Sequence, residues 1–591
     1  MPADRRAAFV VVGLVAIALG LGSWLLLRPP SDAPATTAPS ATPAGPSTTT
    51  KATARTALAA QDRARRERER RAIERRATIE SRSIRATVSS LNGGLRSATL
   101  LSERYEDTST GRPLEMVSTD KEAYLPFRVE LVGISLPPDA TWQLEPLGAS
   151  AVRLRWEGDG VRVTRKLEAR GDYQLWSTIR VENLGNSPRR VRARTGVFHW
   201  VPREHEGGGF FAAPSPRIAH GVCALSDRVE RFGREDAYGG QNHGPGVRFA
   251  GVENTYFAML VAAVGEPAEA CWVRAEDRPS AAQPQGTLFE VRLVGRVVEI
   301  PPGGQTTFRV LGYVGPKETA ALAAAGHGLL DAVDRGWFST IADWLVRLLA
   351  ELYGLVGNWG LAIILMTVLV RIALLPLTVQ QLRSFAAMRR LKPELDAIQA
   401  RYGDDREKKG AAIMELYRRH GVNPAAGCLP TLAQLPVWFA FYASLSTNVE
   451  LYHADFALWW TDLSAPDPYF VLPLLLGVLM FVQQKITPTT MDPLQAKIML
   501  YAMPAMITLF MLFLPAGLCL YMATNSVLGI VQQHIVTRHF ERLDRAARAS
   551  APAPAAPATA PSEAAVHSPR PAPTAPGGKA PHSTRRNRGG R

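Results

Sequence analysis

Arg371 places a charged side chain inside the otherwise apolar run of residues 361–377 (LAIILMTVLVRIALLPL), which is long enough to cross a bilayer. A charge at membrane depth is costly, and it usually faces a polar cavity or a partner within the protein. The simpler alternative places Arg371 near a helix end, with its head group reaching the lipid headgroups. Because apolar residues continue to Leu377 beyond the arginine, we favour a polar cavity, in which Arg371 would attract acidic groups.

Polar side chains recur at a similar depth in several other apolar segments. Thr367 precedes Arg371 by four residues, so both lie on one face of a helix. Gln434 falls in the next apolar segment, Gln484 ends the following one, and Asn525 lies in the last. Further polar residues near these are Gln483, Ser526, Gln532 and Gln533. A hydrogen bond between helices explains any one amide, whereas the whole set around an arginine predicts a water-filled half-channel open to the cytoplasm.

One apolar segment is rich in methionine, at Met499, Met503 and Met506, with Phe510 nearby. Methionine adapts its shape to its neighbours, and methionine-rich surfaces suit varied apolar ligands. Side chains that simply face lipid explain the same composition equally well. The sequence therefore allows either a surface for apolar clients or a lipid-facing helix.

The polar and methionine residues described above lie in apolar segments, and the hydropathy pattern predicts that these segments span a membrane. Six membrane spans are expected, from the uncharged run 7–27 and from residues 358–377, 428–447, 469–484, 498–514 and 517–536. The loop after the second span is rich in Arg and Lys, whereas residues 448–468 contain neither. By the positive-inside rule, both termini lie in the cytoplasm, and residues 1–28 form an uncleaved signal-anchor helix.

Residues 84–330 have a different texture, with short runs of alternating apolar and polar residues broken by Gly, Pro and Asn. Strands are expected at 152–156, 160–167, 173–181, 191–196 and 289–298, which predicts an all-β sandwich outside the cytoplasm. Cys223 and Cys271 both fall in this domain, and the sequence leaves open whether they form a disulfide. No metal-ligand spacing links its histidines, which include His199, His205, His220 and His243.

The remaining segments connect these domains. Residues 29–83 combine a Pro/Ala-rich disordered spacer with an Arg/Glu-rich segment at 63–76, which is expected to be a solvated helix. Residues 331–356 predict an amphipathic helix on the outer leaflet, or one docked against the β domain. Residues 357–536 form the helical core and include a cytoplasmic helical hairpin at 380–421. Residues 537–591 are expected to be a basic, disordered cytoplasmic tail.

The net charge of +15 is concentrated in the Arg/Glu-rich segment, the hairpin and the tail. Such basic patches suit anionic lipids or the nucleic acid of a ribosome, and charge alone does not separate these partners. A soluble enzyme is disfavoured because no nucleophile–base motif or Walker-type loop is present. A small-solute transporter or channel is the main alternative, although the core shows no evident internal repeat.

Six strings in residues 357–533 resemble the YidC-type membrane protein insertases: GNWGLAII, VRIALLPLT, MRRLKPELDAIQARYGDD, ELYRRHGVNPAAGCLPTLAQLPVWFAFY, FALWWTDLSAPDPYFVLPLLLG and PAGLCLYMATNSVLGIVQQ. The string SLNGGLRSATLLSERY extends the resemblance to the β domain. The resemblance implies a five-helix insertase core around a hydrophilic groove, in which Arg371, Thr367, Gln434 and Tyr521 face the client. Relatives often carry a second aromatic residue where this chain has Met522, so the client contacts are expected to differ there.

The resemblance also implies a mechanism without a cofactor or metal. Nascent membrane proteins would place short polar flanks in the groove, and their hydrophobic segments would slide into lipid between the third and fifth spans. The expected slide residues are Met499, Met503, Met506, Phe510, Trp438 and Phe439. Further expected partners are the ribosome or signal recognition particle machinery at the hairpin and tail, anionic lipids, and a Sec translocon. The implied location is the inner membrane, with the β domain in the periplasm.

Overall fold

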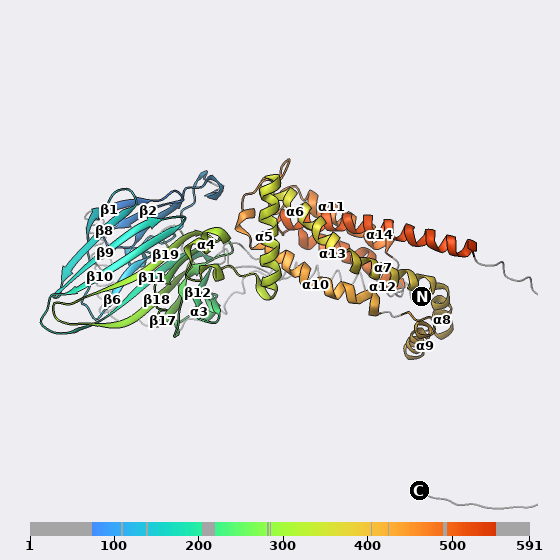
Figure 1. Cartoon of the computed structure of the whole chain (residues 1–591), viewed down its shortest axis with the longest axis horizontal. Helices are drawn as coiled ribbons and strands as arrows, with labels where there is room; N and C mark the ends of the chain where they lie inside the picture. The colour runs from blue at the N-terminus through green and yellow to red at the C-terminus, as the bar shows by residue number, and fades with distance from the viewer. Residues whose placement is uncertain are drawn as a thin grey trace, which may run out of the picture. The chain divides into compact units, whose positions relative to one another are not determined.

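The computed structural model describes residues 74–550, apart from 108–109, 138–139, 204–218, 281–282, 284, 404, 423–424 and 488–492. The predicted signal-anchor helix, the Pro/Ala-rich spacer, nearly all of the Arg/Glu-rich segment and residues 551–591 of the tail therefore lie outside the described residues. The described chain begins with β-strands and continues with helices (Figure 1). Both parts are built from elements whose positions the sequence pattern largely predicts.

Two large antiparallel sheets form the first part. The nine-stranded sheet has the order β13 (Val229–Phe232), β12 (His220–Ala224), β15 (Phe249–Glu253), β16 (Phe257–Ala263), β19 (Gln305–Pro316), β10 (Gln174–Asn183), β9 (Val161–Arg170), β8 (Ala151–Gly158) and β7 (Gln143–Pro146). The five-stranded sheet has the order β14 (Gln241–His243), β17 (Ala270–Asp277), β18 (Gly286–Ile300), β11 (Arg189–Pro202) and β6 (Arg128–Val132).

Smaller elements complete this part. The three-stranded sheet contains β1 (Arg76–Glu80), β2 (Ile84–Ser89) and β3 (Leu95–Leu100), and β4 (Glu106–Asp107) pairs with β5 (Arg112–Pro113). Short helices are η1 (Glu103–Tyr105), η2 (Glu122–Tyr124), α3 (Arg234–Ala237), α4 (Thr319–Ala325) and η4 (Leu329–Ala332).

The sandwich prediction is confirmed, and the burial pattern gives its cause. In β9, buried Val161, Val163 and Leu167 alternate with more exposed neighbours, as a strand with one face in a core requires. The five predicted strands all overlap observed ones, namely β8, β9, β10, β11 and β18, and those at 160–167 and 173–181 begin one residue too early. The sheet region begins earlier than residue 84, because β1 pairs with β2 and buries Ala77 and Ile79.

One disulfide and one buried arginine stabilise the sandwich. Cys223 of β12 and Cys271 of β17 form a disulfide between the two large sheets, which answers the question that the sequence leaves open. Arg165 occupies an inward position of β9 and is only 1% exposed. Its guanidinium donates to the Ser177 hydroxyl (2.9 Å), Gly93 O (2.6 Å) and Phe127 O (2.9 Å). This buried arginine therefore ties two loops to the nine-stranded sheet.

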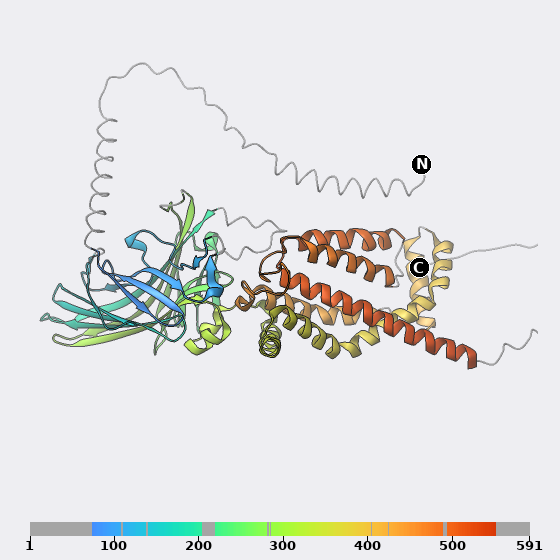
Figure 2. The same cartoon turned by 90° about the horizontal axis from the view of Figure 1, so that it is seen from above.

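The second part is helical. Its elements are η5 (Gly336–Phe338), α5 (Ser339–Val356), α6 (Trp359–Ala373), α7 (Leu375–Arg390), α8 (Lys392–Tyr402), α9 (Arg406–Arg419), α10 (Ala425–Ser446), η6 (Val449–Leu451), α11 (Val471–Ile486), α12 (Pro493–Lys497), the π-helix η7 (Ile498–Ala502), α13 (Met503–Met511) and α14 (Ala516–Ser550). Helix α5 runs across the direction shared by α6, α10, α11, α13 and α14 (Figures 1 and 2).

Few described helices meet the length and hydropathy expected of a membrane span. Residues 494–511 do so, and α6 together with 375–384 would do so as a pair bent by 60°. Shorter apolar helices occur at 435–446 and 471–486. The segment 358–377, predicted as a span, is not one straight helix, because the chain bends between Ala373 and Leu375. Pro376 lies in the first turn of α7 and lacks the N–H that would continue the bonding of α6.

Helix α14 continues to Ser550, so residues 537–550 are helical, although the disordered tail is predicted to start at 537. This stretch (TRHFERLDRAARAS) is rich in helix-forming residues, and extending an existing helix requires no new nucleation.

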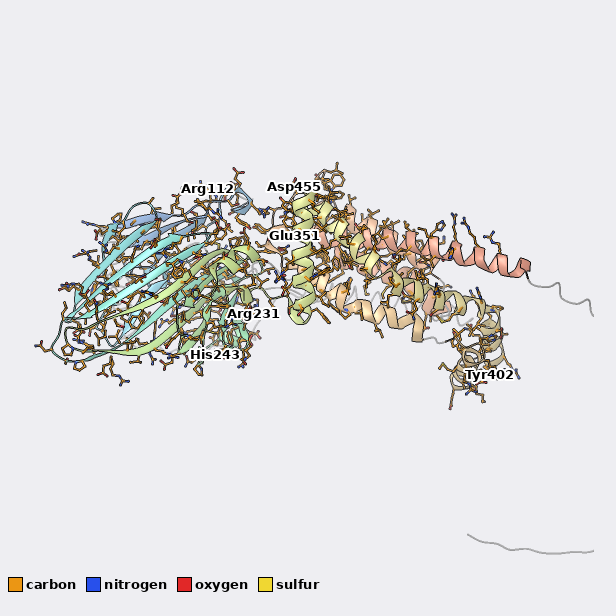
Figure 3. The ribbon with its side chains drawn as sticks, viewed as in Figure 1. Arg112, Arg231, His243, Glu351, Tyr402 and Asp455 are labelled. Carbon is orange, nitrogen blue, oxygen red and sulfur yellow. A yellow bond between two sulfur atoms is a disulfide. The ribbon has the colours of Figure 1, made fainter. Side chains whose placement is uncertain are left out.

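Helices α8 and α9 form the two arms of the predicted hairpin, which pack through Leu391, Leu395, Leu416 and Tyr417. The first arm begins beside Pro393, in the first turn of α8. Tyr402 at the hairpin turn and Asp455 in the loop before α11 lie at opposite ends of the helical part (Figure 3).

The loop between α10 and α11 packs against the sandwich. Val449 belongs to the same buried cluster as the sandwich core and is 2% exposed. The Tyr452 ring lies 5.3 Å from the rings of both Tyr256 and Phe257, and 6.2 Å from that of Tyr105. The loop between α10 and α11 and the β domain therefore share one apolar core.

Candidate functional site

The site is built around Arg371, which lies in the last turn of α6. Its Nε donates to Asn525 Oδ1 (2.7 Å) and its Nη2 to Asn525 O (2.9 Å), while Nη1 donates to Gln532 Oε1 (3.2 Å). The helix end that the simpler alternative requires is thus present. However, the side chain turns toward α14 instead of extending to the lipid headgroups, so amide oxygens satisfy the guanidinium.

A small cavity lies beside this arginine. Its volume is about 10 Å³, which is enough for roughly one water molecule. The wall is formed by α6, α10 and α14 and by the residue between α6 and α7, through Thr367, Val370, Arg371, Leu374, Val437, Trp438, Phe441, Tyr521 and Asn525. Four of the predicted groove residues therefore meet here, namely Arg371, Thr367, Tyr521 and Asn525. The predicted slide residue Trp438 joins them.

Two of these residues are held by local interactions. Thr367 is 1% exposed, and its hydroxyl donates to Ile363 O (2.7 Å) one turn earlier in α6. The Tyr521 ring stacks on Phe441 with centroids 4.4 Å apart and an interplanar angle of 12°. Both side chains thus have fixed positions on the cavity wall.

Two predicted groove residues are not placed at this cavity. The side chain of Gln434 lies outside the described residues, although its backbone belongs to α10. Gln484 instead donates from Nε2 to Met499 O (3.4 Å), a backbone carbonyl of the π-helix η7. A carbonyl in such a widened turn is available to a side chain, because the regular α-helical bonding is interrupted there.

The expected slide residues divide between two places. Met499 lies in η7, and Met503, Met506 and Phe510 lie in α13, which packs on α11. Phe439 faces η5, where its ring stacks on Phe338 with centroids 6.1 Å apart. Helices α10 and α13 pack mainly on other helices rather than on each other. The structure therefore does not bring the two groups of slide residues together.

Sequence reasoning missed Gly529 and Phe441. A Cβ on Gly529 would lie 3.2 Å from Arg371 Nη2 and 3.1 Å from Gln483 Nε2, so this position leaves room for the arginine. A glycine inside a predicted helix, one turn from Asn525, is the signal that could have identified it. No comparable signal marked Phe441, which is one of several aromatic residues in its span.

No group of three or more His, Cys, Asp or Glu side chains that could hold a metal occurs among the residues that the structure describes. The polar side chains that line the cavity carry an amide, a hydroxyl, a phenol, an indole N–H and one guanidinium. This arrangement suits hydrogen bonding and the attraction of anionic groups.

Comparison with known proteins decides the family. Residues 76–348 match the family described as YidC periplasmic domain, and residues 351–543 match the family described as 60Kd inner membrane protein. A protein named Membrane protein insertase YidC, from Anaeromyxobacter dehalogenans, is 34% identical over 504 residues, which cover 81% of this chain and 86% of the relative. The chain belongs to the YidC family of membrane protein insertases.

Further YidC proteins agree with this assignment. The relative from Anaeromyxobacter sp. strain K is 35% identical over 503 residues, covering 81% of this chain and 86% of its own length. A solved structure described as an active YidC insertase is 20% identical, covers 78% of this chain and 92% of its own, and has a TM-score of 0.32, too low to support further argument. The YidC resemblance seen in the sequence is confirmed, and the chain is an inner-membrane insertase with a periplasmic domain.

Proposed function

We propose that the chain inserts nascent hydrophobic segments through a hydrophilic groove centred on Arg371. The supporting observation is that Arg371 lines a cavity and, within the described part of the chain, forms no ion pair with a carboxylate. An uncompensated guanidinium of this kind attracts the acidic residues in the polar flank of a client.

The hydrogen bonds of Arg371 suggest how a client engages. Asn525 and Gln532 supply neutral amide oxygens, whereas a client carboxylate would form charge-assisted bonds, which are about twice as strong. The client would thus displace the amides of α14 and widen a cavity that holds roughly one water molecule.

The wider arrangement is part of the same proposal. Six membrane spans would place both termini and the hairpin of α8 and α9 in the cytoplasm, with the sandwich in the periplasm. The hydrophobic segment would leave toward lipid past Trp438 and the methionines of η7 and α13, gaining the free energy of transfer from water. The hairpin and the basic tail would contact the ribosome, its targeting machinery or anionic lipids, and the core would work alone or with a Sec translocon.

Site-specific photo-crosslinking during translation of a stalled single-span client tests this proposal. Probes at Thr367, Gln434 and Tyr521 should crosslink the client, and a probe at Val531 serves as the control. Val531 is 47% exposed on α14 and does not line the cavity. Crosslinks of equal strength at Tyr521 and Val531 would show that the client passes along the outside of the helices instead of through the groove.

A further inference from the structure

The apolar segment 498–514 contains one turn of π-helix. This turn is η7, and it lies between α12 and α13. The N–H of Met503 donates to Ile498 O, five residues earlier, whereas a regular α-helical bond joins residues four apart. Single π-turns are rare and are frequent at functional sites, so a specific interaction is expected to maintain this one.

The π-turn leaves the carbonyl of Met499 without a helical partner. Its α-helical donor would be the N–H of Met503, which already bonds to Ile498 O. Its π-helical donor would come from the residue five positions later, Pro504, which has no N–H. The proline ring also clashes with the carbonyl four residues before it in a regular helix. Pro504 therefore accounts both for the widened turn and for the unused carbonyl.

Gln484 of α11 supplies the missing donor. Its Nε2 donates to Met499 O in a long hydrogen bond of 3.4 Å. A second contact joins the same elements three residues earlier on α11, where the Phe481 ring lies 5.8 Å from the ring of Tyr501. Both contacts attach η7 to α11.

Helix α11 is itself anchored at this end. Gln533 of α14 is 8% exposed, its Nε2 donates to Ile486 O (3.0 Å), and its Oε1 accepts from the Thr487 hydroxyl (3.4 Å). The end of α11 is thus fixed to α14, the helix that also holds Arg371. Because Gln484 lies only two residues before Ile486, it attaches η7 to a fixed support.

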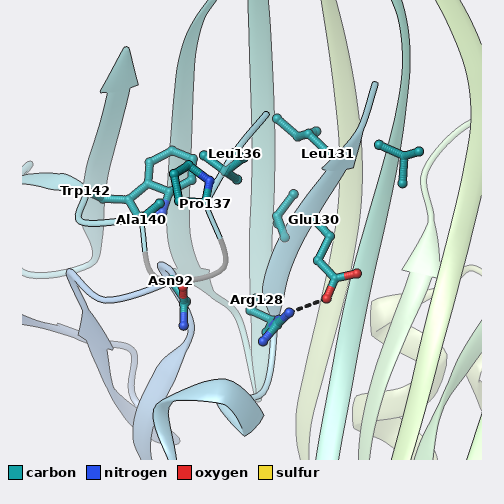
Figure 4. Close-up of a pocket in the computed structure, with 10 residues that line it drawn as sticks. Asn92, Arg128, Glu130, Leu131, Leu136, Pro137, Ala140 and Trp142 are labelled. Carbon is teal, nitrogen blue, oxygen red and sulfur yellow. Dashed lines mark hydrogen bonds and ion pairs between the residues drawn. The ribbon is translucent and has the colours of Figure 1, made fainter. Parts of the chain in front are cut away.

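A polar group in this segment has fewer alternative partners than one in the sandwich. At the larger cavity, of about 230 Å³ beside β6, Arg128 pairs with Glu130 (Figure 4). Glu130 also accepts from Arg292 (3.0 Å), so the loss of one arginine leaves it another. Residues 494–511 instead have the length and hydropathy of a membrane span, where no water replaces the lost partner of a carbonyl. The bond from Gln484 is therefore expected to determine where η7 lies.

We propose that Gln484 is a positioning residue for client release, which holds the π-turn of η7 against α11 through the Met499 carbonyl. This inference rests on the proposed function, in which the hydrophobic segment leaves past Trp438 of α10 and the methionines of η7 and α13. With Gln484 in place, the η7 wall of that exit stays on α11 and apart from α10. Without it, η7 is free to move toward α10, and the exit narrows. Clients with bulky hydrophobic side chains would then be released least well.

A pair of substitutions distinguishes this role from a direct contact with the client. Gln484→Met removes the donor and keeps the length of the side chain. Pro504→Ala restores an N–H that can donate to Met499 O, so Gln484 becomes dispensable in that background. A direct contact between Gln484 and the client would instead make Gln484→Met equally harmful in both backgrounds. Val482→Met, at a 38% exposed position of α11, is the control for the added methionine.

The position of η7 is measured without a client, by joining Phe481→Cys and Tyr501→Cys with a short bismaleimide. Cys428 and Cys519 are replaced by Ala in this chain, and a protease site between α11 and α12 reveals the crosslinked product on a gel. We expect Gln484→Met to reduce crosslinking about threefold, and to change it little when Pro504 is also replaced by Ala. Undiminished crosslinking in Gln484→Met, or equal losses in both backgrounds, would overturn the inference.

Insertion is scored in membrane vesicles by protease protection of two single-span clients, one with a segment of Leu and Ala and one that also carries Phe and Trp. We expect Gln484→Met to lower insertion of the bulky client about threefold and that of the other client much less. A general loss of stability would not produce this difference. Equal losses for the two clients would overturn the inference alone. Failure of the unsubstituted chain to insert either client would overturn the proposed function and this inference with it.

Discussion

Arg371 of α6 and Asn525 of α14 are joined by two hydrogen bonds, one to the side-chain oxygen at 2.7 Å and one to the backbone oxygen at 2.9 Å. The backbone oxygen remains when the Asn525 side chain is replaced. Helix α14 therefore holds the guanidinium through its main chain as well as through a side chain. The arginine is therefore oriented without a carboxylate partner among the described residues, as the proposed function requires.

Replacing Arg371 separates the roles of charge and geometry. Arg371→Lys keeps the charge but loses the planar fork that contacts both Asn525 and Gln532, so we expect intermediate insertion. Arg371→Ala removes the attraction, and Arg371→Glu repels acidic flanks, so both should insert severalfold less client than Arg371→Lys. Protease protection of a client with acidic flanks measures the order. Equal activity in all three variants would show that the charge is dispensable.

Gly529 allows the position of the arginine to be changed without altering its charge. A Cβ here would lie 3.2 Å from Arg371 Nη2, so Gly529→Val should push the guanidinium off Asn525 and reduce insertion by severalfold. Gly354→Val is the matched control, because a Cβ on Gly354 of α5 meets nothing within 4 Å. Insertion by both variants is compared at equal amounts of membrane-embedded protein. A similar loss of insertion in both variants would indicate an effect of valine on helix stability instead of a displacement of the Arg371 guanidinium.

Arg165 should contribute to the stability of the sandwich in proportion to its three buried hydrogen bonds. Arg165→Met leaves Gly93 O and Phe127 O without their donor, which we expect to cost at least about 2 kcal/mol of unfolding free energy. Arg162→Met is the control on the same strand. Arg162 is exposed and pairs with Glu157 and Glu182, so its replacement should change stability much less than that of Arg165. Thermal unfolding in detergent compares the two variants. Equal decreases in melting temperature would contradict a stabilising role for the buried hydrogen bonds of Arg165.

We expect His199 to make the sandwich less stable in acid. Burial lowers the pKa of His199 to about 4, whereas the side chain titrates near its ordinary value of about 6.5 once the chain unfolds. The unfolded state therefore binds more protons between these values, and stability falls as the pH drops from about 6.5 toward 4, by up to about 3 kcal/mol. Melting temperatures at pH 7.5 and pH 4.5 measure this. In His199→Gln, which does not titrate, the difference between the two should be smaller.

Much of the fold follows from local patterns in the sequence. The alternation in β9 and the apolar runs of α10 and α11 each belong to a single element, so a short stretch of sequence is enough to predict them. Strand β1 escaped detection because its five residues follow an Arg/Glu-rich segment, and pairing with β2 makes it a strand. Pairing between strands is a tertiary effect that periodicity alone does not report.

The site was harder to predict than the fold. The spacing of Thr367 and Arg371 correctly places both on one cavity wall, but it does not show that the Thr367 hydroxyl bonds to Ile363 O. Depth in a span also does not distinguish Asn525, which meets the arginine, from Gln484, which bonds to η7. Helix rotation and the irregular turn of η7 decide these contacts, and both arise from packing between helices.

The position of Val449 in the core of the sandwich has a mechanical consequence. A side chain from the loop after α10 completes the hydrophobic interior of a domain that ends more than one hundred residues earlier in the chain, near Pro316. A movement of α10 would therefore reach the periplasmic sandwich directly through the contact of Val449 with its core, without involving α5. The helical part and the sandwich are thus joined at a point that neither the domain order nor the hydropathy profile reveals.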